Sequence, residues 1–131
     1  ADRNFGCGSS RENAAWTLVD NGIRSVIAPS FGDIHYNNEM NNGMVPVILD
    51  AEICADLRRQ LHDSPGGEIT VDLERNVVVV PDGREHSFSI PAFNRERLLR
   101  GLDDISFSLE QENEIATYEV KRRDEACWLF E

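Results

Sequence analysis

The sequence predicts an α/β domain in which a parallel sheet with covering helices is followed by an antiparallel meander. Apolar strands alternate with helical stretches as far as about residue 61, an order typical of parallel sheets with helices packed on them. A Ser-Pro-Gly-Gly turn at residues 64–67 ends that alternation. Short runs with period-two or β-branched patterns come after it, separated by tight turns, as in antiparallel hairpins.

The part before this turn contains three expected helices and two expected strands. The helices cover residues 12–20, 30–41 and 51–61, and the strands cover residues 24–28 and 45–49. Gly22 and Gly43 follow the first two helices, because glycine readily adopts the left-handed conformation that ends a helix. We expect the second helix to begin at Ser30, directly after Pro29.

The part after the turn contains three expected strands, over residues 68–73, 76–80 and 86–90, with a Pro-Asp-Gly hairpin turn at 81–83. Two helices are expected to follow, over residues 93–101 and from 104 to about 122. Their apolar residues recur at a helical interval and predict a core stripe. The stripe consists of Leu98, Leu99, Leu102, Ile105, Leu109, Ile115 and Tyr118. The tail has an apolar cluster, which we expect to pack on this domain or on a partner.

Length and charge narrow the class of protein. A chain of 131 residues predicts a single domain over residues 1–131. Its 24 acidic and 13 basic residues give a net charge of −11, which opposes nucleic acids and anionic membrane surfaces as partners. No apolar run approaches the roughly 20 residues that a membrane helix requires, and no secretory leader is evident. We therefore expect a cytoplasmic protein.

The cysteines and histidines of this chain show no metal-binding spacing. Cys7, Cys54 and Cys127 are far apart and show no Cys-x-x-Cys spacing, so neither a disulfide nor a metal site within this chain is predicted. We expect Cys7 to behave as a small buried apolar residue. The histidines are expected on the surface or at an edge; they are His35, His62 and His86. Three arginines on one expected helix are expected to face solvent or a partner; they are Arg95, Arg97 and Arg100.

The most informative segment is Gly6-Cys7-Gly8-Ser9-Ser10-Arg11-Glu12. Glycines let the backbone turn its N–H groups toward a ligand, and the first turn of a helix carries unpaired donors and a partial positive charge. Arg11 can hold an anion with two parallel hydrogen bonds. This combination predicts a site for a carboxylate or phosphate.

A second interpretation of the same segment is purely local. Ser9 and Glu12 have the Ser-x-x-Glu spacing of a capping box, in which the two side chains satisfy backbone groups at a helix start and nothing is bound. Capping and anion binding are compatible, so the spacing leaves both open. A Walker phosphate loop is not supported, because the Lys-Ser/Thr pair is absent.

Several motifs in order resemble the small subunit of 3-isopropylmalate dehydratase, in the aconitase superfamily. They are Gly6-Cys7-Gly8-Ser9-Ser10-Arg11-Glu12, Ala15-Trp16, Ala28-Pro29-Ser30-Phe31-Gly32-Asp33-Ile34, Tyr36-Asn37-Asn38, Asn42-Gly43, Pro46 and Leu98-Leu99-Arg100-Gly101-Leu102-Asp103-Asp104-Ile105. The resemblance runs from the first residues to about Lys121. It implies the swivelling domain of the aconitase type, active only together with a large subunit.

The resemblance also implies roles in a hydro-lyase reaction that interconverts 2-isopropylmalate and 3-isopropylmalate in leucine biosynthesis. Ser9 is then the catalytic base, and Gly8, Ser10 and Arg11 bind the substrate carboxylates. A 4Fe-4S cluster belongs to the large subunit, and this chain binds no metal. Glu12 is expected to be the cap rather than a chemical group.

This sequence departs from the family pattern in places. Asn13 stands where the family usually has His, and Glu39-Met40 stand where Cys-Phe is common. The family's N-terminal segment, which contains a substrate-selecting loop, is expected to be missing before Ala1. Related small subunits act on citraconate or homoaconitate, so the substrate stays open. A non-catalytic anion-binding or assembly module is the alternative from another class.

Overall fold

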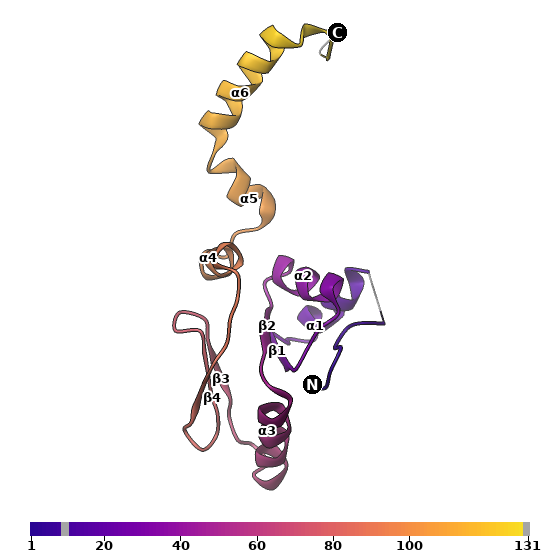
Figure 1. The fold of residues 1–131 in the computed structure, drawn as a ribbon, viewed down its shortest axis with the longest axis vertical. Helices are drawn as coiled ribbons and strands as arrows, with labels where there is room; N and C mark the ends of the chain where they lie inside the picture. The colour runs from indigo at the N-terminus through magenta and orange to yellow at the C-terminus, as the bar shows by residue number, and fades with distance from the viewer. Residues whose placement is uncertain (9–10, 130–131) are drawn as a thin grey trace. The chain divides into compact units, whose positions relative to one another are not determined.

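The computed structural model describes residues 1–8 and 11–129. The chain consists of two compact units, Ala1–Gly101 and Leu102–Glu131. The first unit contains both sheets, and the elements described in the second are all helices (Figure 1).

The first unit confirms the predicted mixed α/β class. Its elements are α1 (Asn13–Asp20), β1 (Ser25–Ala28), α2 (Asp33–Asn41), β2 (Val45–Ile48), α3 (Ala51–Asp63), β3 (Thr70–Asp72), β4 (Val77–Val79), β5 (Glu85–Ser87) and α4 (Ala92–Arg100). Strands β1 and β2 are parallel, with Ser25 opposite Val45 and Ala28 opposite Ile48. Strands β3, β4 and β5 form the expected antiparallel meander, in that order.

The helices α1 and α2 end at the predicted glycines, but α2 begins later than the sequence predicts. Gly22 and Gly43 have φ values of +81° and +75°, the left-handed conformation expected after α1 and α2. The predicted start of the second helix at Ser30 is wrong, since α2 begins at Asp33. Residues before it are held by the N-terminal segment, because Phe5 forms an isolated parallel bridge with Phe31.

The parallel pair of strands separates two apolar clusters. On one face, Val26 and Ala28 of β1 pack with Phe31 and Met44, and the side chains of α1 pack against them. On the other face, Val47 of β2 belongs to a larger cluster that α3 and the meander complete. Its buried members are Met40, Val47, Leu49, Cys54, Leu57, Val78, Val80, Phe88 and Ile90. The alternation of β1 therefore assigns successive side chains to opposite cores.

Two arginines of α4 are not surface residues, contrary to expectation. Arg97 is buried, donates to Asn41 Oδ1 at 2.9 Å and lies 5.8 Å from the centre of the Phe93 ring. Arg95 is half-buried and donates to the carbonyls of Leu73 and Glu74. Their guanidinium groups satisfy backbone and side-chain acceptors at the ends of neighbouring elements, which residue type alone does not reveal.

The second unit consists of α5 (Asp104–Leu109), α6 (Glu112–Glu125) and the 3-10 turn η1 (Cys127–Leu129). The predicted helix from 104 to about 122 is therefore interrupted between Leu109 and Glu112. Asp103 caps α5 by accepting a hydrogen bond from the backbone N–H of Ser106. No helix among the described residues is long and apolar enough to cross a membrane.

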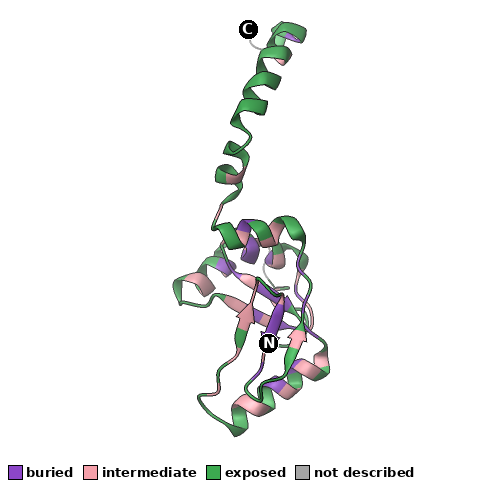
Figure 2. Cartoon of the chain, turned by 90° about the vertical axis from the view of Figure 1, so that its left-hand side faces the viewer, coloured by how far each residue is buried: buried purple, intermediate pink, exposed green. Residues whose placement is uncertain are grey.

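The predicted core stripe is wrong for its members on α5 and α6, whereas Leu98 of α4 packs against the larger apolar cluster as expected. Ile105 is 71% exposed and Tyr118 is 64% exposed, and Figure 2 shows both helices almost wholly in the exposed colour. The other exposed members are Leu99, Leu109 and Ile115, while Leu98 and Leu102 are half-buried. A helical interval indicates which residues share a face, and burial requires an element packed on that face as well.

Candidate active site

The segment before the glycine motif runs beside the end of β1. Its backbone is held by hydrogen bonds from Phe5 N–H to the Ser30 carbonyl at 3.0 Å and from Gly32 N–H to the Phe5 carbonyl at 2.8 Å. Asn4 N–H donates to Ser30 Oγ at 2.9 Å, which adds a side-chain anchor. These bonds bring the glycine motif to the carboxyl end of the parallel strands, the edge where ligands bind in many α/β folds.

Glycine is required at positions 6 and 32 because another residue lies against the glycine backbone at each position. Gly6 has φ +74°, and a Cβ placed on it would lie 2.1 Å from His35 Cγ. A Cβ on Gly32 would lie 2.9 Å from the Cα of Cys7. The turn is therefore pressed against the start of α2, and neither position accommodates a larger residue without movement.

The predicted site residues that the structure describes face outward. A Cβ on Gly8 would meet nothing within 4 Å, so the backbone there borders open space. Arg11 is exposed, as the binding of an anion from solvent requires. Ser9 and Ser10 lie outside the described residues. Cys7 is exposed, which corrects its predicted burial: Gly6, and not Cys7, is the residue of the turn that packs inward.

The Ser9 half of the predicted capping box lies outside the described residues, and the structure describes only Glu12 at the start of α1. Glu12 is itself the N-cap residue, and its side chain makes no capping hydrogen bond. Instead, its Oε1 accepts from Asn42 Nδ2 at 3.0 Å, which ties α1 to the end of α2. The N–H groups of Ala14 and Ala15 donate to the carbonyls of Arg11 and Glu12. Those two donors are therefore already used within the first turn.

A buried ionisable pair lies under the turn. His35 and Glu39 are 2% and 0% exposed, and His35 Nε2 lies 3.0 Å from Glu39 Oε1. The two atoms lack the alignment of a hydrogen bond, and neither side chain has another such partner within the described part of the chain. Burial raises the pKa of Glu39 from 4.5 to about 7 and lowers the pKa of His35. The prediction of His35 as a surface residue is wrong, whereas His62 is exposed as expected.

Replacing Glu39 with glutamine is expected to make stability less dependent on pH. A folded-state pKa above the unfolded value means that the contribution of Glu39 is complete below pH 4.5 and is lost as the pH rises to about 7. The wild-type chain should therefore lose on the order of 3 kcal/mol more than Glu39→Gln between about pH 5 and about pH 8. Urea unfolding at both pH values measures this difference.

The exposed Glu52→Gln variant is the matched control and should follow the wild type. Parallel stability curves for wild type and Glu39→Gln would show that the Glu39 carboxyl titrates normally in the folded chain.

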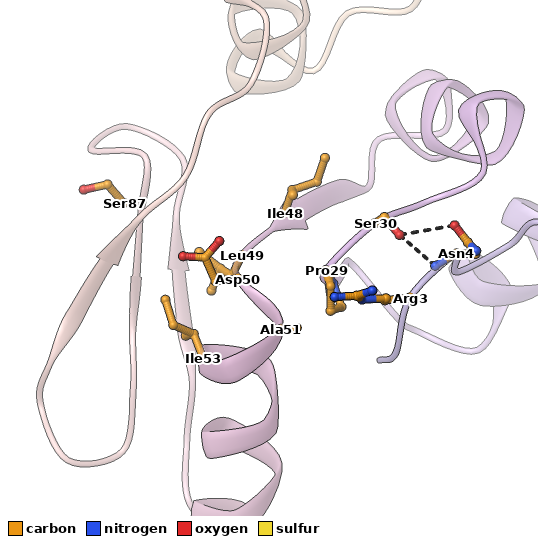
Figure 3. Close-up of a pocket in the computed structure, with 10 residues that line it drawn as sticks. All are labelled: Arg3, Asn4, Pro29, Ser30, Ile48, Leu49, Asp50, Ala51, Ile53 and Ser87. Atoms are coloured by element: carbon orange, nitrogen blue, oxygen red, sulfur yellow. Dashed lines mark hydrogen bonds between the residues drawn. The ribbon is translucent and has the colours of Figure 1, made fainter.

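A cavity of about 580 Å³ lies at the same carboxyl edge of the strands (Figure 3). Its volume is in the range of small-ligand sites. Its lining consists of Arg3, Asn4, Pro29, Ser30, Ile48, Leu49, Asp50, Ala51, Ile53 and Ser87. Neither Gly8 nor Arg11 belongs to that lining.

Sequence reasoning did not select the polar residues of this cavity. Ser30 and Asp50 each lie two residues beyond the end of a parallel strand, and the rule that ligands bind beyond the carboxyl ends of such strands could have selected them. Arg3 carries no such signal, because the bridge between Phe5 and Phe31 brings it to the edge. A guanidinium and a carboxylate thus line one cavity next to the glycine motif.

The described side chains do not fit an iron–sulfur cluster or another metal ion. Across residues 1–8 and 11–129, no three side chains of His, Cys, Asp or Glu gather into a set that could hold a metal. Cys54 is buried in the larger apolar cluster, and Cys7 and Cys127 are exposed in different units.

Comparison with known proteins gives consistent results along the chain. Residues 1–52 match the family described as Aconitase C-terminal domain, and residues 55–92 match the family described as LeuD_N. Proteins named 3-isopropylmalate dehydratase small subunit, from Marinobacter nauticus and Hahella chejuensis, are each 49% identical over 130 residues. Those matches cover 99% of this chain and 60% of each relative, so the chain spans about three fifths of their length.

A solved structure agrees in fold. The crystal structure of 3-isopropylmalate dehydratase (LeuD) from Methanocaldococcus jannaschii superposes with a TM-score of 0.63 and 30% sequence identity. The superposition covers 91% of this chain and 66% of that one. The chain belongs to the family of 3-isopropylmalate dehydratase small subunits, in the aconitase superfamily.

Proposed function

We propose that this chain acts as the small subunit of a 3-isopropylmalate dehydratase, a hydro-lyase that interconverts 2-isopropylmalate and 3-isopropylmalate through isopropylmaleate in leucine biosynthesis. The observation that carries the proposal is the 49% identity over 130 residues with proteins of that name. The open space in front of Gly8 and the exposure of Arg11 support it, because a substrate must reach this segment from outside.

In this proposal Ser9 removes a proton from the substrate carbon beside a carboxylate, and the neighbouring carbon loses its hydroxyl group, so that the proton and the hydroxyl together make up one water. Returning water with the opposite placement completes the isomerisation. A serine hydroxyl is a weak base at its normal pKa, so it can act only where backbone N–H groups and a nearby cation stabilise the alkoxide. Arg11 is two residues from Ser9 and is the candidate cation.

In this proposal the substrate is bound by Gly8, Ser10 and Arg11. Arg11 can hold a carboxylate through two parallel hydrogen bonds, and Ser10 can donate a third. The absence of a side chain at Gly8 lets a carboxylate approach the backbone, which the open space in front of it supports.

The large subunit is the proposed partner and the proposed carrier of a 4Fe-4S cluster. Such a cluster supplies a Lewis acid for the substrate hydroxyl when it is bound. The scattered positions of the cysteines support a cluster held by the partner rather than by this chain. A single swivelling domain over residues 1–131 and a cytoplasmic location, both expected from the sequence, stay predictions.

A substrate panel tests this function against related hydratases. The complex of this chain with a cluster-loaded large subunit should give its highest kcat/KM with 2-isopropylmalate. Citraconate lacks the isopropyl group, and a lost apolar contact of this size should lower kcat/KM by about 10-fold or more. A higher kcat/KM with citraconate or homoaconitate would assign the chain to the related hydratases instead. Binding of the large subunit with no turnover of any of the three acids would favour an assembly module.

A further inference from the structure

The buried face of α2 under the glycine turn has an unusual composition. His35 and Glu39 are one helical turn apart and point toward the same side, where His35 supports Gly6. The His35 ring also contacts Phe5 edge to face, with ring centroids 5.4 Å apart. A single imidazole thus touches two consecutive residues of the segment that leads to Ser9.

This contact requires a flat side chain in one orientation. A Cβ on Gly6 would lie 2.1 Å from His35 Cγ and 2.2 Å from Cδ2, so the glycine backbone rests on the ring itself. Glu39 Oε1 lies 3.0 Å from the Nε2 atom on the far part of that ring. A fully buried carboxylic acid beside a buried imidazole is unfavourable for stability compared with apolar side chains of the same size. The pair is therefore better explained by placement of the ring than by stabilisation of the core.

We infer that His35, packed between Glu39 and the turn, is a positioning residue that fixes the conformation of the turn from Phe5 to Gly8. The inference rests on the proposed function, since the turn leads directly to Ser9 and Arg11. It assigns a role to a buried histidine of α2 that takes no part in binding the substrate.

Hydrogen exchange measures the order of the turn without requiring activity. The N–H groups of Phe5 and Gly32 make the two backbone bonds that hold the segment, and those of Val45 and Leu49 serve as references at β2. In His35→Ala, exchange at Phe5 and Gly32 should become about 10-fold faster relative to the references, because the support under Gly6 is lost.

Two variants distinguish placement from general packing. Met40→Ala removes a buried side chain of the same helix that belongs to the larger apolar cluster and should leave the ratio of exchange rates near that of the wild type. His35→Phe keeps a flat ring and should restore the slow exchange that His35→Ala loses. Equal acceleration at all four N–H groups in His35→Ala would overturn the inference.

Gly6→Ala tests the same contact from the side of the turn and serves if His35→Ala does not fold. The added Cβ meets the ring at a backbone angle of φ +74°, so exchange at Phe5 and Gly32 should accelerate as in His35→Ala. Unchanged exchange in Gly6→Ala would show that the ring does not hold the turn.

Turnover in the complex with the large subunit then distinguishes the positioning role of His35 from the proposed function of the chain. For His35→Ala we expect kcat to fall about 10-fold with wild-type complex formation, and His35→Phe to restore it. Faster exchange with wild-type kcat would overturn the positioning role. A wild-type complex without any turnover would count against the proposed function, while the exchange rates still decide whether His35 fixes the turn.

Discussion

Replacing Ser9 with alanine is expected to lower kcat of the complex with the large subunit by about 10²- to 10⁴-fold, the usual contribution of a general base. Alanine removes the oxygen that takes the substrate proton and changes little else. Complex formation should be unaffected, because a single hydroxyl contributes little to an interface of standard size. Steady-state kinetics and co-elution on a sizing column measure the two effects.

Two other serines serve as controls for this prediction. Ser10→Ala should raise KM more than it lowers kcat, since Ser10 is proposed to bind a carboxylate rather than to move a proton. Ser89→Ala changes an exposed residue just beyond β5 and should leave both constants unchanged. Turnover of Ser9→Ala at the wild-type rate would remove Ser9 from the mechanism.

Replacing Arg11 with glutamine should raise KM by about 10- to 100-fold, because one charge-assisted pair of hydrogen bonds to a carboxylate is lost. Lysine at this position keeps the charge but not the two-pronged geometry, so Arg11→Lys should recover only part of the affinity. Initial rates across a range of substrate concentrations measure the change.

Arg24→Gln is the matched control for Arg11. Arg24 is also exposed and donates to the carbonyl of Val19, at the opposite end of α1 from Arg11. Arg24→Gln should therefore leave KM at the wild-type value. If the two glutamine variants had the same KM as the wild type, Arg11 would not hold the substrate.

Local signals predicted most of the first unit. Gly22 and Gly43 end their helices because only a residue without a side chain adopts those φ values easily. The Pro-Asp-Gly turn at residues 81–83 correctly predicted the hairpin between β4 and β5. Such signals depend on neighbours in sequence, and a single chain displays them directly.

The errors concern contacts between distant segments. His35 was predicted at the surface, but the turn around Gly6, about 30 residues earlier in the chain, covers it. Arg97 is buried because Asn41 accepts its hydrogen bond. The apolar stripe through Ile105 and Tyr118 has the correct period, but no element among the described residues of its unit covers it. Residue type and spacing do not indicate which distant segment of the chain will contact a given side chain.

The candidate site was predicted in part. The glycine motif was selected from its composition, and the structure places Gly8 and Arg11 at the surface as anion binding requires. The cavity next to it, with Arg3 and Asp50 in its lining, was not predicted. It forms where the segment before the motif meets the ends of two strands, and therefore depends on the fold.

We propose that this chain supplies the base and the carboxylate-binding groups to a reaction completed by another polypeptide. A titration of this chain into a cluster-loaded large subunit tests this division of roles, with formation of isopropylmaleate from 2-isopropylmalate followed by absorbance. We predict no product from either chain alone and a rate that rises with added chain until it saturates at one chain per large subunit. A rate that stays at the level of the large subunit alone throughout the titration would contradict the account.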